Sequence, residues 1–158
     1  MPDTIAVRLS TDHCPLGEGY ARRHLATPPK VAVLSCEGAC LRGEVSRRAA
    51  TIVTRELAPE RTVRICHGGL LEAGDGGMRA LVKHARQVLM LDGCAMACGE
   101  RLLRGAMPDV QPTVVVTDQL FEFDRSSFSL EEMSEADVAA HARTVAGRVL
   151  ERLGSPAR

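Results

Sequence analysis

The chain has 158 residues, of which 45% are hydrophobic, so it is long enough for one domain with a sizeable core. Twenty basic residues balance twenty acidic ones, and this zero net charge predicts neither a nucleic-acid partner nor binding to an anionic membrane surface. Aromatic residues make up only 3%, with no tryptophan, which argues against stacking platforms for single-stranded nucleic acid.

The sequence also bounds the compartment in which we expect this protein. Its apolar runs are far shorter than the ~20 residues that a membrane-spanning helix needs. The N-terminal stretch carries Asp3 and has no basic head followed by an apolar core, so we expect no secretory signal and a cytoplasmic location. Thiols stay reduced in that compartment, and the six cysteines therefore suit metal ligands or reactive thiols better than a disulfide framework.

Strands and helices alternate along most of the chain. Residues 1–29 are a weakly patterned lead-in, in which 4–9 has the composition of a short strand, and we expect one α/β domain over 30–154. The expected strands cover 30–35, 62–66, 86–91 and 113–117, and the expected helices cover 42–57, 78–85, 94–103 and 130–152. A flexible glycine-rich loop is expected over 68–77, and Gly154 should end the last helix.

Short strands that are apolar throughout, alternating with helices, predict a mostly parallel sheet of four or five strands. Helices should cover both faces of this sheet, which gives a three-layer flavodoxin-like or Rossmann-like α/β fold. In the flavodoxin-like strand order 2-1-3-4, the first strand lies between the second and the third, ~4.8 Å from each.

Five of the six cysteines directly follow the expected strands. Cys36 and Cys40 come after the first strand, Cys66 after the second, and Cys94 and Cys98 after the third. Because the carboxyl ends of parallel strands share one edge, where ligands bind, we expect Cys36 to lie between Cys66 and Cys94, all within ~10 Å. Thiolates gathered in this way indicate a metal site, with Zn²⁺ as the expected ion, or a redox site.

The two Cys-x3-Cys pairs have equal spacing. If each pair opens a helix, its two sulfurs lie one turn apart on one face, where the helix N-terminus favours the thiolate. Arg42 could offset the negative charge of a tetrathiolate zinc site, and Asp92 should cap the turn into the helix that follows it. His67 is a further candidate ligand or hydrogen-bond donor to a ligand, and Asp118 could approach the same edge.

Other interpretations of the cysteines remain open at this point. The spacing Cys36-x5-Arg42 resembles the phosphate-binding loop of low-molecular-weight tyrosine phosphatases and thioredoxin-linked arsenate reductases, which use a cysteine nucleophile. Gly43 departs from their pattern, which has Ser or Thr after the arginine, and their Asp-Pro motif is absent. Disulfide exchange within either Cys-x3-Cys pair and an iron–sulfur cluster are further alternatives. Whether the protein is an enzyme is left undecided, and Cys14 stands outside the repeating pattern.

The third cysteine element resembles the signature of the DGC-domain family, which is named for an Asp-Gly-Cys tripeptide. The strand at 88–91 is followed by Asp92-Gly93-Cys94 and then by Cys98, and the two earlier elements match the family in order over about 30–118. Zinc binding has been inferred for this family, without an assigned reaction. The resemblance implies a metal ion as the partner and Cys36, Cys66, Cys94 and Cys98 as zinc ligands, with Cys40 as a variable extra.

Overall fold

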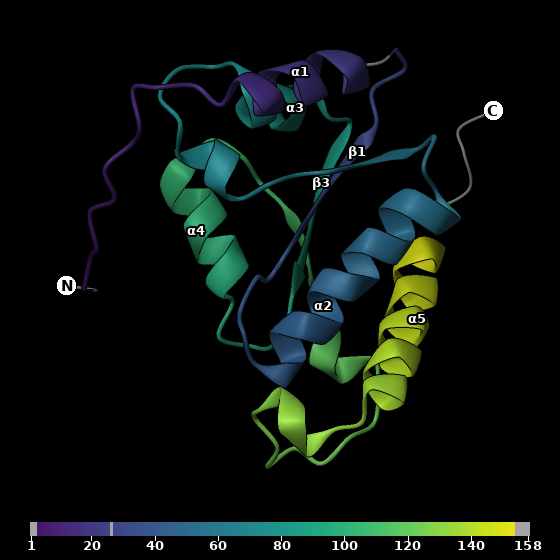
Figure 1. The fold of residues 1–158 in the computed structure, drawn as a ribbon. Helices are drawn as coiled ribbons and strands as arrows, with labels where there is room; N and C mark the ends of the chain where they lie inside the picture. Colours follow the sequence, from purple (N-terminus) through teal and green to yellow (C-terminus); the bar gives the residue numbers. More distant parts are fainter. Residues whose placement is uncertain (1–2, 26, 154–158) are drawn as a thin grey trace.

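The computed structural model describes residues 3–25 and 27–153 and contains a four-stranded, all-parallel sheet in the order β2-β1-β3-β4 (Figure 1). The strands are β1 (Val31–Ser35), β2 (Thr62–Arg64), β3 (Gln87–Asp92) and β4 (Thr113–Val116). The central strand β1 is buried along its whole length, as its uninterrupted apolar composition predicts. The flavodoxin-like strand order is therefore confirmed.

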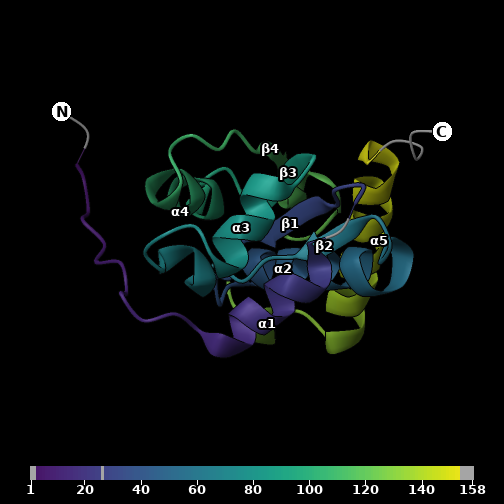
Figure 2. The same ribbon diagram turned by 90° about the horizontal axis from the view of Figure 1, so that it is seen from above.

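Helices cover both faces of the sheet, so the three-layer α/β fold is confirmed (Figures 1 and 2). Because successive strand residues point to opposite faces, Val31 and Val33 of β1 face one hydrophobic cluster and Ala32 and Leu34 face the other. The first cluster includes α2 (Leu41–Ile52) and α5 (Glu135–Arg152). The second includes α1 (Pro15–His24), α3 (Gly77–His84) and α4 (Cys98–Ala106).

The lead-in contains a helix where no helix was expected. Pro15 is the first residue of α1, and the Cys14 sulfur accepts a hydrogen bond from the Gly17 amide at 3.3 Å, as an N-cap does. Of the residues in α1, Ala21 is buried, which explains why the apolar pattern is weak. This contact gives Cys14 a structural role outside the predicted site.

The expected strand over 4–9 is wrong. The segment runs on the α4 side of the molecule, away from the sheet, and forms no strand within the described residues (Figures 1 and 2). Just beyond it, Ser10 forms a single bridge to Glu72. A β-propensity becomes a strand only when a neighbouring strand accepts its hydrogen bonds, and here Ile5 and Val7 stay 88% and 60% exposed.

The long helices differ from the expected ones at their ends. The helix over 42–57 is realised as α2 continued by a π-helical segment, η1 (Val53–Leu57). The helix expected over 130–152 is broken into a 3-10 turn, η4 (Leu130–Glu132), and α5, because Met133 adopts an extended conformation and Ser134 caps α5 anew. The capping box of Ser129 and Glu132 is present but serves the short turn. Gly154 lies outside the described residues.

The glycine-rich stretch after β2 is more ordered than expected. Gly68–Leu71 form a 3-10 turn, η2, whose Leu70 side chain is fully buried. The Ala73 amide then donates to the Ser10 carbonyl at 2.8 Å. The buried Leu70 side chain and the Ala73–Ser10 hydrogen bond hold this stretch in place, whereas its glycines had predicted a flexible loop. In the part of the chain that is described, every helix is too short or too polar to cross a membrane.

Candidate functional site

The structure places the five sequence-predicted cysteines on the loops and helix starts that follow three neighbouring strands. Cys66, Cys36 and Cys94 follow β2, β1 and β3, which are neighbours in that order. The Cys36 amide donates to the Leu91 carbonyl at 2.8 Å, which extends the β1–β3 ladder one residue beyond β1. Three separate segments of sequence therefore bring thiols to the same carboxyl edge, as expected for a binding edge of this fold.

The thiols share an edge but are not gathered into a coordination cluster. Within residues 3–25 and 27–153, no three His, Cys, Asp or Glu side chains are arranged to hold a metal ion. All six cysteines are free; Cys66 and Cys98 are exposed, whereas Cys36, Cys40 and Cys94 are partly buried. Zinc–sulfur bonds of ~2.3 Å would require the loops that carry these residues to close on one another.

The first Cys-x3-Cys turn lies against the start of α2. A Cβ atom at Gly38 would lie 3.4 Å from the Cys36 sulfur and 3.8 Å from the Cys40 sulfur, so both thiols flank the same residue. A Cβ at Gly43 would lie only 2.3 Å from the Gly38 carbonyl oxygen, so only glycine allows the turn to pack this closely on the helix. A dithiol redox pair would also need two thiols close to the same residue.

The surroundings of Cys36 favour the protonated form of its thiol. Burial raises the pKa of the Cys36 thiol, while hydrogen bonds from the Gly38 and Gly93 amides to the sulfur act in the opposite direction and are the smaller effect. The nearby Asp92 carboxylate adds to the increase. A cation close to the sulfur would reverse this balance, because the two amides already point at the position of the negative charge.

The second Cys-x3-Cys turn is built around a buried carboxylate. Asp92, which has no exposed surface, accepts hydrogen bonds from the Gly99 amide at 2.8 Å and the Glu100 amide at 3.0 Å. These are first-turn amides of α4, so the expected capping role of Asp92 is confirmed. Between the two cysteines of this turn, Ala97 adopts a left-handed conformation with φ of 52°, which strains a non-glycine residue.

The glycine of the tripeptide joins the two turns. A Cβ at Gly93 would lie 2.9 Å from both the carbonyl carbon and the carbonyl oxygen of Arg42, so its absence lets the end of β3 pass against the start of α2. The expectation that each cysteine pair opens a helix is wrong. The N-cap of α2 is Cys40 and the first residue of α4 is Cys98, because the first cysteine of each pair still belongs to the loop after the strand.

Arg42 is held by the loop after β4 instead of by the cysteines. Its guanidinium donates to the carbonyls of Ser127 and Arg125, both at 2.8 Å, and lies 3.4 Å from an Asp118 carboxylate oxygen. It also stacks over the Phe123 ring at 4.8 Å. These contacts do not support the expected roles of Arg42 as a counter-charge for thiolates or as the arginine of a phosphate-binding loop. They also give Asp118 a structural role.

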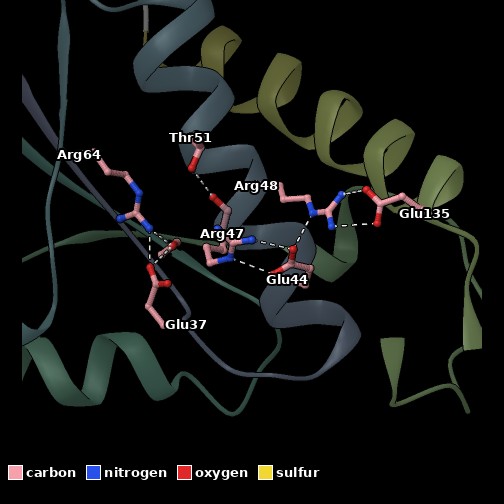
Figure 3. A network of polar contacts seen from close by, with 8 residues as sticks. Glu37, Glu44, Arg47, Arg48, Thr51, Arg64 and Glu135 are labelled. Carbon is pink, nitrogen blue, oxygen red and sulfur yellow. Dashed lines mark hydrogen bonds and ion pairs between the residues drawn. The ribbon is translucent and has the colours of Figure 1, made fainter. Parts of the chain in front are cut away.

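A polar network that the sequence did not predict links Arg64 at the end of β2 to Ser35 and Glu37 at the end of β1 (Figure 3). Arg64 of β2 donates to the Ser35 hydroxyl at 2.6 Å and to the Ile65 carbonyl at 2.9 Å, and forms an ion pair with Glu37. The Ser35 hydroxyl in turn donates to Glu37 at 2.8 Å. The signal was an arginine within an otherwise apolar strand, which indicates a charged side chain that must find partners near its end.

His67 is the other polar group at this end of β2. Burial lowers the pKa of its imidazole, which therefore favours the neutral form. Its Nε2 atom is buried and has no hydrogen-bond partner among the described residues. A neutral imidazole nitrogen in this condition can bind a metal ion or accept a hydrogen bond. Its role as a ligand stays a prediction.

A second charged network fastens the helix that carries the first turn (Figure 3). Glu44 in the first turn of α2 pairs with Arg47 at 2.7 Å and with Arg48 at 2.6 Å, and Arg48 also pairs with Glu135 of α5. The hydrogen bonds from Arg47, and then those from Arg48, lower the pKa of Glu44 to about 2. The start of α2 is thereby tied to the start of α5 on the face opposite α4.

The cysteines of the carboxyl edge lie within the part of the chain that matches a protein-family model. No curated protein and no solved structure was found to match the chain. The family model described as DGC domain matches residues 32–145, which run from β1 into α5 and contain all five cysteines of the carboxyl edge. The match covers well over half of the sequence, and the chain therefore belongs to the DGC-domain family.

Proposed function

We propose that this protein binds a transition metal ion, with Zn²⁺ as the preferred ion, at the carboxyl edge of the sheet. The proposed ligands are the thiols of Cys36, Cys66, Cys94 and Cys98, with Cys40 as a fifth available thiol. The observation that carries the proposal is the order β2-β1-β3, which places cysteines from three distant segments after three adjacent strands. The DGC resemblance implies the same ion and the same four residues.

The side chains at this edge are of the right kind for zinc. The thiols are free, and Zn²⁺ is held in proteins chiefly by thiolate sulfur and imidazole nitrogen. The Nε2 atom of His67 offers such a nitrogen, whereas the Glu37 carboxylate is already engaged by Arg64. When bound, zinc would supply a structural cross-link among the loops or, with a ligand position left open, a Lewis acid.

The residues of the chain prepare this site in two ways. The amides of Gly38 and Gly93 donate to the Cys36 sulfur, so part of the stabilisation that a thiolate needs is in place before its proton leaves. The Asp92 cap and the close approach at Gly93 hold the roots of both Cys-x3-Cys turns together. Closure of the site then needs movement of the loops and not of the strands.

Elemental analysis of protein purified under reducing conditions tests the proposal. We expect close to one zinc ion per chain, and we expect Cys94→Ser to lose most of it because one thiolate of the set is gone. The matched control is Cys14→Ser, since Cys14 is the N-cap of α1 and follows none of the strands, so its loss should leave the zinc content unchanged. Stoichiometric iron with labile sulfide would instead favour the iron–sulfur alternative.

Two outcomes would contradict the proposal. One is wild-type protein that takes up no zinc when the ion is supplied to the reduced chain. The other is equal zinc loss in Cys14→Ser and Cys94→Ser, which would mean that the ion binds thiols without regard to their place in the fold.

A further inference from the structure

A cleft of about 870 Å³ runs along the outer edge of β2, beside the cysteine edge. Its walls come from α1, from η1 and from β2 itself, and its lining extends to Cys66 and His67. This volume lies within the range of about 300–1,000 Å³ that is typical of small-molecule sites. Of the proposed zinc ligands, only Cys66 lines this cleft, and the metal proposal leaves the space along β2 and η1 without a role.

The lining of the cleft is mainly apolar. Val63 of β2 and Ile65, just after β2, form one wall, and Met78 and Tyr20 contribute to the others. The Tyr20 hydroxyl donates to the Arg64 carbonyl at 3.0 Å, which satisfies a strand carbonyl on the side away from β1. An added β-strand would need that carbonyl, so the cleft suits a small apolar ligand better than a peptide in extended conformation.

The two arginines that line the cleft differ in whether they already have an ionic partner. Arg64 is already engaged by Glu37 and by the carbonyl of Ile65. Arg55 of η1 also lines the cleft, is exposed, and forms no ion pair with any described residue. An arginine beside an apolar wall is a suitable partner for a carboxylate, which it can hold with two parallel hydrogen bonds.

We infer that this cleft binds a small molecule with an apolar body and a terminal carboxylate. The body lies along Val63 of β2 and the adjoining Ile65, and the carboxylate pairs with Arg55. The inference does not depend on the proposed metal site, because none of these three residues is among the proposed ligands. Because Cys66 and His67 also line the cleft, a molecule that fills it would lie beside the Cys66 thiol of the carboxyl edge.

Fluorescence titration with dansyl-labelled undecanoic acid tests this inference. We expect saturable binding of one probe per chain and a roughly ten- to thirtyfold weaker affinity for Arg55→Gln, which loses a charge-assisted pair. The methyl ester of the same probe should bind wild type and Arg55→Gln equally. The matched control is Arg148→Gln, an exposed arginine of α5 outside the cleft, which should leave both affinities unchanged.

Methionine methyl resonances locate the bound probe. We expect the Met78 signal to shift on titration and the Met96 signal to stay in place, because Met78 lines the cleft and Met96 is an exposed residue of the second cysteine turn. Absence of saturable binding would overturn the inference, and so would a shift of Met96 without Met78. Zinc content measured on the same samples keeps failure of this inference distinct from failure of the metal proposal.

The competing occupant is the exposed segment 3–9 of a second copy of this chain. In that case the protein would run as a dimer in size-exclusion chromatography with light scattering, and the probe would bind only after residues 3–9 were removed. That result would overturn the small-molecule inference in favour of a subunit contact.

Discussion

The two Cys-x3-Cys turns share a spacing but are supported in different ways. The first turn, 36–40, lies on α2, and its close packing depends on a missing side chain at Gly43. The second turn, 94–98, is held from beneath by the buried Asp92 carboxylate and contains the strained residue Ala97. The same four-residue separation therefore corresponds to two different local structures.

The second turn also shows which residues of the Asp92-Gly93-Cys94 tripeptide have a structural role. Asp92 satisfies amides of α4, and Gly93 allows β3 to pass close to Arg42, so the first two residues of the tripeptide build the strand–turn–helix connection. Only Cys94 is left with a reactive group and no structural partner in the tripeptide. Two of the three residues of the signature therefore serve the turn that carries Cys94.

The largest effect should come from removing the support of the second turn. We expect Asp92→Ala to lower the free energy of unfolding by about 2–4 kcal/mol, because the Gly99 and Glu100 amides lose a charged acceptor in a buried place. Asp92→Asn keeps one acceptor oxygen and should cost less. Urea denaturation followed by circular dichroism measures the change.

The control for this change is Asp109→Ala, which removes an exposed carboxylate from the loop before β4 and should alter stability by less than about 0.5 kcal/mol. If Asp92→Ala were as stable as Asp109→Ala, the second turn would not depend on its carboxylate, and the contrast between the two turns would be lost.

A smaller effect is expected when the first turn is pushed away from α2. Gly43→Ala introduces a Cβ that would meet the Gly38 carbonyl at 2.3 Å, and we expect a loss of about 1–3 kcal/mol in the free energy of unfolding. Gly147→Ala is the matched control, because the same substitution in α5 meets no atom within 4 Å. It should stabilise the helix by about 0.5–1 kcal/mol. Equal behaviour of the two variants in thermal unfolding would show that the turn does not press on the helix.

Much of the architecture could be predicted because it follows from patterns of apolar residues. The runs at β1 and β3 are apolar without alternation, which predicts buried parallel strands, and the cysteines follow them directly. The helix α1 could not be predicted in this way, since it buries little beyond Ala21 and depends on contact with α3. Propensity is a weak guide where packing decides the outcome.

The site was predictable in position but not in detail. The strand order brings Cys36, Cys66 and Cys94 to one edge, and that order follows from general rules of α/β topology. The partners of Arg42 and Arg64 depend on where loops distant in sequence end up, such as the one containing Ser127. Sequence spacing carries no information about these tertiary hydrogen bonds, so the sequence could not show that Arg42 contacts Asp118 and loop carbonyls.

The smallest predicted effect provides the most selective comparison of the two turns. Ala97 is the one non-glycine residue with positive φ in the described chain, and a left-handed alanine costs roughly 1 kcal/mol. Ala97→Gly removes that strain but adds freedom to the unfolded chain, so we expect a net gain in stability of about 0.5 kcal/mol. The equivalent position of the first turn is Ala39, which has no such strain, and Ala39→Gly should lose about 0.5–1 kcal/mol. Differential scanning calorimetry of the two variants should therefore show melting temperatures that move in opposite directions. A fall in both would mean that the left-handed residue is not strained, and that the two turns differ only in what lies beneath them.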